Sequence, residues 1–137
     1  MGRIIALDFG TKRVGIAVTD PLKIIANALT TIHPNEVNAY LINYCLKEAV
    51  EKIVVGLPMQ MNGQASESEI HIKPFIKKLE AALPAIPIVR YDERFTTKMA
   101  LQSMIEGGYK KKDRQDKKRL DSISATLILQ GYLLSVQ

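Results

Sequence analysis

Residues 4–19 read IIALDFGTKRVGIAVT, and this stretch decides the fold. Two β-rich runs, Ile4 to Phe9 and Val14 to Thr19, flank the turn residues GTKR at 10–13. Strands joined by a short turn that contains glycine form a β-hairpin. A third, weaker strand is expected over Ile24 to Ile32. The chain is therefore predicted to begin with antiparallel strands.

The pattern changes after His33, because apolar residues then recur at helical spacing from Val37 to Tyr44. Asn35 is the expected N-cap of this first helix. The run KIVVGL at 52–57 is short and almost uniformly apolar, which is typical of a parallel strand buried on both faces. These residues predict a helix followed by an internal strand of a parallel sheet.

Helices and strands continue to alternate in the second half of the chain. Apolar spacing predicts a second helix from Ile72 to Leu83, with Pro74 in its first turn, where the missing N–H of proline is tolerated. The remaining predicted elements are a strand, a short helix and a long helix, at residues 86–91, after Thr96 or Thr97, and at 120–136.

This order predicts an α/β fold with a mixed five-stranded sheet, antiparallel at one side and parallel at the other, flanked by helices. We expect a single domain over residues 1–137. With 47% hydrophobic and 24% charged residues, the chain has an ordinary globular composition, which excludes a disordered or collagen-like protein. No apolar run is long enough to cross a membrane and no signal peptide is evident, so we expect a cytoplasmic protein with no membrane partner.

The positive charge of the chain is concentrated in the segment GGYKKKDRQDKKR at 107–119. Seven basic and two acidic residues there account for the whole net charge of +5, since the remainder holds twelve of each sign. Such a segment is either a solvated surface loop or a clamp for a polyanion, and phosphate backbones are the commonest polyanions. The basic residues in this segment are Lys110, Lys111, Lys112, Arg114, Lys117, Lys118 and Arg119.

Four acidic residues end predicted strands or begin a helix. Strand alternation puts Asp8 on the same face as Ile4, and a carboxylate that continues an apolar face needs hydrogen bonds or a metal ion. Asp92 and Glu93 end the fifth strand and point to opposite faces, and the residues alone do not choose between them. Asp121 begins the last helix, where the helix dipole favours an acidic residue even without a catalytic role.

These carboxylates favour a particular class of metal ion. Parallel α/β sheets bind ligands beyond the carboxyl ends of their strands, where Asp8 and the pair at 92–93 are expected. Oxygen ligands without a suitable set of Cys or His residues favour Mg²⁺ or Mn²⁺ over zinc. The sequence therefore indicates an acidic site that acts on phosphate with a hard divalent cation.

Four motifs of this chain resemble one known family. They are ALDFGTKRVGIAVTD at 6–20, VVGLPMQMNG at 54–63, YDERFTT at 91–97 and RLDSISATLIL at 119–129. Their order and spacing resemble the YqgF family, also called RuvX, a Holliday junction resolvase-like family implicated in maturing the 5′ end of pre-16S rRNA. The resemblance covers nearly the whole chain and implies a ribonuclease H-like nuclease domain.

The resemblance also implies an active site. It assigns Asp8, Glu93 and Asp121 as the catalytic, metal-binding acids, and so favours Glu93 over Asp92. The more distant RuvC resolvases carry additional acids, at places that correspond here to residues 56–58 and to Ser124. The implied site therefore holds three acids rather than four, with Mg²⁺ or Mn²⁺ as cofactor for phosphodiester hydrolysis.

The expected substrate is structured nucleic acid. Thr11, Lys12, Arg13 and Arg94 would contact phosphates near the acids, and the basic segment would contact the backbone farther away. Processing of the 5′ end of pre-16S rRNA in ribosome biogenesis is favoured, so structured RNA is expected over branched DNA. The alternatives are a Holliday junction resolvase and a non-catalytic RNA-binding or ribosome-assembly protein. The sequence does not choose between a monomer and a homodimer.

Overall fold

The computed structural model describes residues 2–57, 69–92 and 117–136, with side chains from residue 124 onward in the last range. The described elements are β1 (Arg3–Phe9), β2 (Val14–Thr19), β3 (Ala26–Ile32), a 3₁₀ helix η1 (Pro34–Glu36), α1 (Val37–Lys47), β4 (Val50–Leu57), α2 (Glu69–Ala82), β5 (Ile88–Asp92) and α5 (Lys117–Ser135). The predicted helix after Thr96 or Thr97 lies outside these residues.

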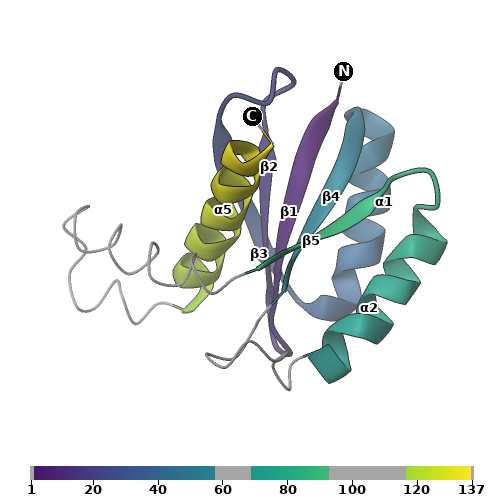
Figure 1. Cartoon of the computed structure of the whole chain (residues 1–137). Coiled ribbons are helices and arrows are strands. Elements are labelled where there is room, and N and C mark those ends of the chain that lie inside the picture. Colours follow the sequence, from purple (N-terminus) through teal and green to yellow (C-terminus); the bar gives the residue numbers. More distant parts are fainter. Residues whose placement is uncertain (1, 58–68, 93–116, 137) are drawn as a thin grey trace.

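The five strands form one mixed sheet in the order β3-β2-β1-β4-β5. β1 pairs antiparallel with β2, and β2 pairs antiparallel with β3. On its other side β1 runs parallel to β4, which runs parallel to β5 (Figure 1). The predicted mixed sheet is confirmed. β1 lies at its centre, and the carboxyl ends of β1, β4 and β5 lie at the same end of the sheet.

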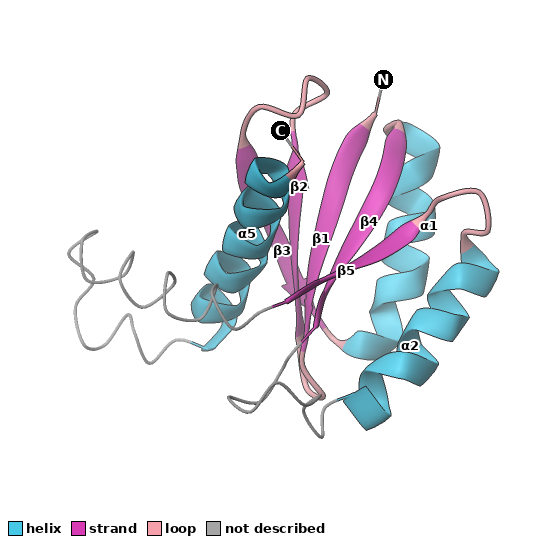
Figure 2. Cartoon of the chain, viewed as in Figure 1, coloured by secondary structure: helices cyan, strands magenta, loops and turns pink. Residues whose placement is uncertain are grey.

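Helices cover both faces of the sheet (Figure 2). Strand alternation sends Ile5 and Leu7 toward a buried cluster with α1 and α2, and sends Ile4 and Ala6 toward α5. The α5 cluster includes Ala6, whose small side chain lets the helix lie close to the sheet. Full burial of one large aliphatic side chain contributes about 1.5–3 kcal/mol, so these two clusters supply the main driving force for folding.

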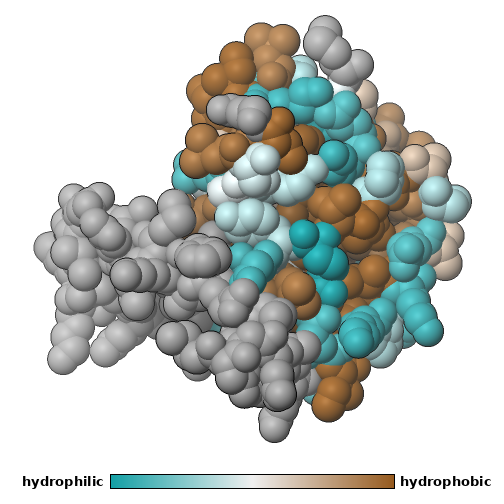
Figure 3. Space-filling view, in the orientation of Figure 1, coloured by the Kyte–Doolittle hydropathy of each residue, from teal (hydrophilic) through white to brown (hydrophobic). Residues whose placement is uncertain are grey.

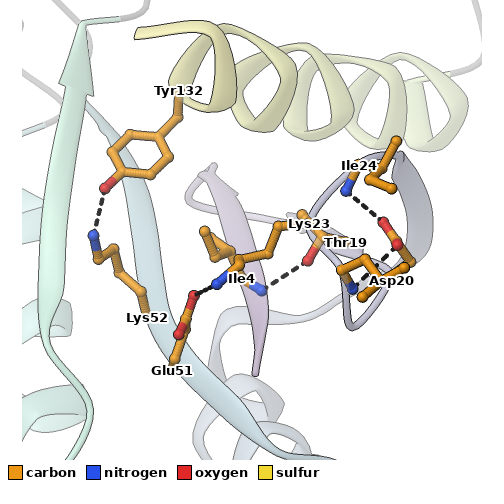
Figure 4. Close-up of polar contacts among 9 residues, drawn as sticks. Ile4, Thr19, Asp20, Lys23, Ile24, Glu51, Lys52 and Tyr132 are labelled. Atoms are coloured by element: carbon orange, nitrogen blue, oxygen red, sulfur yellow. Dashed lines mark hydrogen bonds and ion pairs between the residues drawn. The ribbon is translucent and has the colours of Figure 1, made fainter. Parts of the chain in front are cut away.

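Polar contacts fasten the amino end of the sheet, where β1 and β4 begin (Figure 4). The Ile4 N–H donates to Thr19 Oγ1 at 2.9 Å. Lys52 Nζ, near the start of β4, donates to the Tyr132 hydroxyl of α5 at 2.7 Å. Because Tyr132 belongs to the last turns of α5, the first turns of α5 lie at the opposite, carboxyl end of the sheet (Figure 1).

Two strands begin later than predicted, each because a turn takes its first residues. β3 begins at Ala26 rather than Ile24, since the N–H groups of Ile24 and Ile25 both donate to Asp20 Oδ1 at 2.8 Å. β5 spans Ile88–Asp92 instead of 86–91, because the Ile86 N–H bonds to the Leu83 carbonyl after α2. Local hydrogen bonds therefore override β-propensity at both places.

The starts of α1 and α2 also differ from the prediction. Asn35 is not an N-cap, because residues 34–36 form a 3₁₀ helix in which His33 Nδ1 accepts from the Asn35 N–H at 3.2 Å. α2 begins at Glu69, so Pro74 lies inside the helix rather than in its first turn. Pro74 removes the hydrogen bond to the Ile70 carbonyl, and both residues are exposed, so water can reach that carbonyl.

The last helix, α5, begins at Lys117, three residues earlier than predicted. Lys117, Lys118 and Arg119 therefore belong to its first turn and not to the preceding basic loop. Asp121 is its fifth residue rather than its second. No helix in the described part of the chain is both long and apolar enough to cross a bilayer.

Exposed apolar side chains gather at the amino end. Leu22, Ile24 and Ile25 in the β2–β3 loop are 62%, 69% and 58% exposed. This loop lies at the top of Figure 1, and hydrophobic surface covers the same part of Figure 3. The amino end thus combines internal polar contacts with an apolar outer surface.

Candidate active site

Asp8 lies at the carboxyl end of the central strand and is half-buried. It shares its face with Ile4 and Ala6, the face that α5 covers. Its cross-strand partner in β2 is Gly15. Because directly paired residues present their side chains on the same face, the glycine leaves space beside the carboxylate.

The hairpin turn at 10–13 lies next to Asp8. The Gly10 N–H donates to the Arg13 carbonyl at 2.8 Å. A Cβ at position 10 would lie 2.7 Å from that carbonyl oxygen, so the tight turn requires glycine. Thr11 and Lys12 are exposed and Arg13 is half-buried, as expected for side chains that could contact a ligand at this edge.

β5 ends at the same carboxyl end of the sheet as β1, and its alternate side chains point to the face of Asp8. Val89 and Tyr91 pack against the α5 cluster, whereas Ile88 packs against the α1 and α2 cluster. A Cβ at Gly131 of α5 would lie 2.8 Å from Tyr91 Cζ, so helix and strand approach closely. By alternation, Asp92 belongs to the Ile88 face, opposite Asp8.

The first turns of α5 arrive at this edge from the Asp8 side of the sheet (Figure 1). Ala125 is buried in the same cluster as Ala6, and Ser124 is half-buried beside it. The backbone at Asp121 lies one turn before Ala125, although its side chain is outside the described part. The structure therefore brings Asp8, the end of β5 and the start of α5 to one end of the molecule.

Several predicted site residues lie wholly or partly outside the described residues. For Lys117, Lys118 and Arg119 only the backbone is described, as the first turn of α5. Among the side chains that are described, no three His, Cys, Asp or Glu residues gather as metal ligands. The predicted site residues outside the described ranges are Glu93, Arg94, Lys110, Lys111, Lys112 and Arg114.

A buried ion pair at this edge was missed in the sequence. Arg90 of β5 donates to both carboxylate oxygens of Glu69 at 2.9 and 2.7 Å, and the Glu69 side chain is only 7% exposed. The same guanidinium donates to the carbonyls of Val55 and Gly56 near the end of β4. This pair ties together the ends of two strands and the start of α2. The available signal was a charge in mid-strand, which does not identify its distant partner.

Comparison with known proteins settles the family. The family model described as "RuvX: Holliday junction resolvase" matches residues 2–135. The chain belongs to the RuvX family. The family prediction made from the four motifs is therefore confirmed over almost the whole chain.

Relatives of this RuvX chain match it from end to end. Proteins from Bacteroides fragilis and Christiangramia forsetii are 51% and 53% identical over 133 residues, covering 97% of this chain and 96% and 98% of their own. A protein from Phocaeicola vulgatus is 53% identical over 135 residues, covering 98% and 97%. All three are named as candidate pre-16S rRNA nucleases.

Solved structures agree on the fold. RuvC from T. thermophilus, in complex with a Holliday junction substrate, has a TM-score of 0.60 and 16% identity, covering 98% of this chain and 96% of its own. A second structure of Thermus thermophilus RuvC has a TM-score of 0.59 and 13% identity with the same coverage. The predicted ribonuclease H-like fold is confirmed.

Proposed function

We propose that this chain is a metal-dependent endonuclease that hydrolyses phosphodiester bonds in structured RNA, in a single nuclease domain. Its proposed task is processing of the 5′ end of pre-16S rRNA during ribosome biogenesis in the cytoplasm. End-to-end identity of 51–53% to candidate pre-16S rRNA nucleases supports this substrate. The observation that carries the chemistry is Asp8, a half-buried carboxylate at the carboxyl end of the central strand, with Gly15 beside it.

The proposed catalytic acids are Asp8, Glu93 and Asp121. Val89 and Tyr91 pack on the face of Asp8, so alternation favours position 93 over position 92 for that face. Residues four apart share one face of a helix, so position 121 shares the face of Ala125, which is buried against the sheet. Both arguments support a site assembled from β1, β5 and α5.

The donor chemistry of this set fits Mg²⁺ or Mn²⁺. Asp8 places a carboxylate at the carboxyl end of β1, and oxygen ligands are those that hard divalent cations prefer. When bound, such a cation activates water and stabilises the charge of the leaving oxygen. The protein's own part is to hold Asp8 by the β1–β2 register and to exclude water from its apolar flank with α5.

Phosphate contacts would come from the turn and from the basic segment. Thr11 and Lys12 are exposed beside Asp8, and Arg13 lies next to them. A binding surface that neutralises phosphates makes affinity fall steeply with salt and carries little sequence information. The other proposed contacts are Arg94, Lys110, Lys111, Lys112, Arg114, Lys117, Lys118 and Arg119.

A cleavage assay tests the proposal. Wild-type protein and Asp8→Asn are incubated with Mg²⁺ or Mn²⁺ on an RNA fragment that spans the mature 5′ end of 16S rRNA. We expect the wild type to cut at that end and the variant to bind without cutting. If wild-type protein binds RNA but never cuts it with either metal, the chain is instead a non-catalytic RNA-binding protein.

A Holliday junction resolvase is the second candidate. It is favoured by the description of the family model and by the fold shared with RuvC. A four-way DNA junction has two equivalent cleavage sites and suits a two-fold homodimer. Faster cutting of such a junction than of RNA, by a dimer in sedimentation analysis, would favour this function, whereas a monomer that prefers RNA would exclude it.

A further inference from the structure

A hollow of about 400 Å³ opens at the carboxyl end, on the other side of the sheet from Asp8. Phe9, the residue after Asp8, lines it from the sheet, and Thr11 lines it from the β1–β2 turn. Its remaining walls come from η1, the start of α1 and residues 71–78 of α2, and both α1 and α2 begin at this end (Figure 1). The hollow is thus adjacent to the proposed active site but outside it.

The lining combines aromatic and hydrogen-bonding groups. The rings of Phe9 and Phe75 lie 4.9 Å apart at 50°, and form its apolar side. Asn38, His71 and Lys78 provide amide, imidazole and ammonium groups around it. A concave site of this volume, in which an aromatic pair lies among several hydrogen-bonding side chains, is large enough for a small planar ligand.

Asn38 is the most informative of these residues. Its Oδ1 is buried and accepts no hydrogen bond from any group in the described part of the chain. A buried acceptor without a donor is unfavourable. The terminal torsion of asparagine turns readily, so the amide that lines the hollow can present its oxygen and N–H to a ligand there. An asparagine amide matches the donor and acceptor edge of a nucleobase.

We propose that this hollow binds one nucleobase of the substrate strand, next to the phosphodiester that is cut at the proposed Asp8 site. The proposal rests on the function proposed above and adds a site of base recognition. Asp8 and Phe9 are consecutive and point to opposite faces of the sheet. A nucleic-acid strand that crosses the carboxyl end of the sheet can therefore place a phosphate on one face and a base on the other. Lys78 at the hollow can then contact the adjoining phosphate.

A scan of abasic positions tests the site. Binding of the precursor rRNA fragment is measured by fluorescence anisotropy, with one base removed at a time. All proteins carry Asp8→Asn, so that cleavage does not interfere. Stacking and edge contacts to one base correspond to about a 10-fold change in affinity. We expect one position where removing the base weakens binding by about that factor, and a smaller penalty there after Asn38→Ala.

Two further variants make the result decisive. Asn43→Ala removes the same side chain from α1 outside the hollow, and should keep the full penalty. His71→Ala changes an exposed lining residue on α2, so it reports on the hollow even if Asn38→Ala fails to fold. A reduced penalty in either variant supports the site. A full penalty in both, or no sensitive position at all, overturns it.

The outcomes separate this proposal from the one it rests on. Cutting by Asp8→Asn protein would overturn the proposed active site and leave the abasic profile to be judged by itself. A flat abasic profile alongside normal wild-type cutting would overturn only the hollow as a base site.

Discussion

The two ends of the sheet are built on different principles. At the amino end, Thr19, Lys52 and Tyr132 engage in hydrogen bonds that join strands to each other or to α5. At the carboxyl end, Asp8 borders a glycine, the turn side chains are exposed, and Asn38 Oδ1 has no donor in the described residues. The amino end therefore secures the fold, whereas the carboxyl end exposes the turn side chains of Thr11 and Lys12 to solvent.

The carboxyl end also contains one internal polar contact that stabilises the fold, the ion pair between Arg90 and Glu69. In the Arg90–Glu69 pair, on the α2 side of the sheet, the buried Glu69 carboxylate accepts two hydrogen bonds from the Arg90 guanidinium. The pair joins the ends of β4 and β5 to the start of α2 and so holds the carboxyl end of the sheet in place. The candidate site is thus supported on the α2 side of the sheet by this ion pair, and on the α5 side by apolar packing.

The sharpest way to break the comparison is to exchange one aspartate at each end for asparagine. Asp8→Asn should lower the cleavage rate by about 1,000-fold, because loss of a metal ligand forfeits several kcal/mol of charge stabilisation. Asp20→Asn at the amino end should leave the rate unchanged. Single-turnover cleavage with Mg²⁺ measures both rates. Equal losses of cleavage rate in the two variants would mean that catalysis does not depend on the carboxyl end more than on the amino end.

The next largest effect is expected in stability. Arg90→Leu leaves the buried Glu69 carboxylate without its partner, which costs about 3 kcal/mol of the free energy of unfolding. Arg3→Leu is the matched change at the amino end, since Arg3 is similarly exposed but pairs with Glu48, a 45% exposed side chain. It should cost about 1 kcal/mol or less. Urea unfolding measures both, and equal costs would remove the special role of the buried pair.

The mixed character of the sheet could be predicted from the sequence because it rests on local patterns. Apolar runs around GTKR specify the hairpin, and KIVVGL specifies a strand buried on both faces. The starts of β3 and α1 could not, because they depend on which side chain takes which backbone N–H. The Asp20 carboxylate accepts from the Ile25 N–H and the His33 ring accepts from the Asn35 N–H, and apolar periodicity carries no signal for either bond.

The candidate site, like the fold, could be predicted only in part from the sequence. The position of Asp8 at the end of a strand follows from alternation and is confirmed by the structure. Its role, and those of Glu93 and Asp121, stay predictions. The Arg90–Glu69 pair and the hollow join residues far apart in the chain, so no short motif encodes them. They become visible only when the register of β4 and β5 and the position of α2 are known.

A smaller effect is expected from the basic segment. Each phosphate contact contributes about 0.7–0.9 to the slope of log affinity against log salt. Replacing Lys110, Lys111 and Lys112 by Gln should therefore flatten the slope for RNA by about 2 to 3. Metal affinity should not change, because the proposed metal ligands are the carboxylates and not these lysines.

A single-residue pair controls for the loss of charge alone. Lys110→Gln should lower the slope of log affinity against log salt by about 0.7–0.9, the contribution of one phosphate contact. Lys47→Gln, at the end of α1 and hence at the amino end, should leave it unchanged. Fluorescence anisotropy across a salt series measures the slopes. If Lys47→Gln lowered the slope as much, RNA binding would not be confined to the carboxyl end.

The smallest effect concerns the amino end alone and depends on pH. The Asp20 carboxylate accepts from the N–H groups of Leu22, Ile24 and Ile25, and the bond from Ile25 most strongly holds its pKa below the ordinary 3.8. A carboxyl group with a lowered pKa stabilises the fold above its unfolded pKa, and loses that effect as pH falls through its folded pKa.

Asp20→Ala should therefore lower the Tm at pH 7, and the difference from wild type should shrink as pH falls below 3.8. Thermal unfolding followed by circular dichroism measures both proteins across that range. A difference that stays constant in acid would mean that Asp20 acts through shape and not through charge. A shrinking one would mean that the ionised carboxylate of Asp20, and not its shape alone, holds the β2–β3 turn at the amino end.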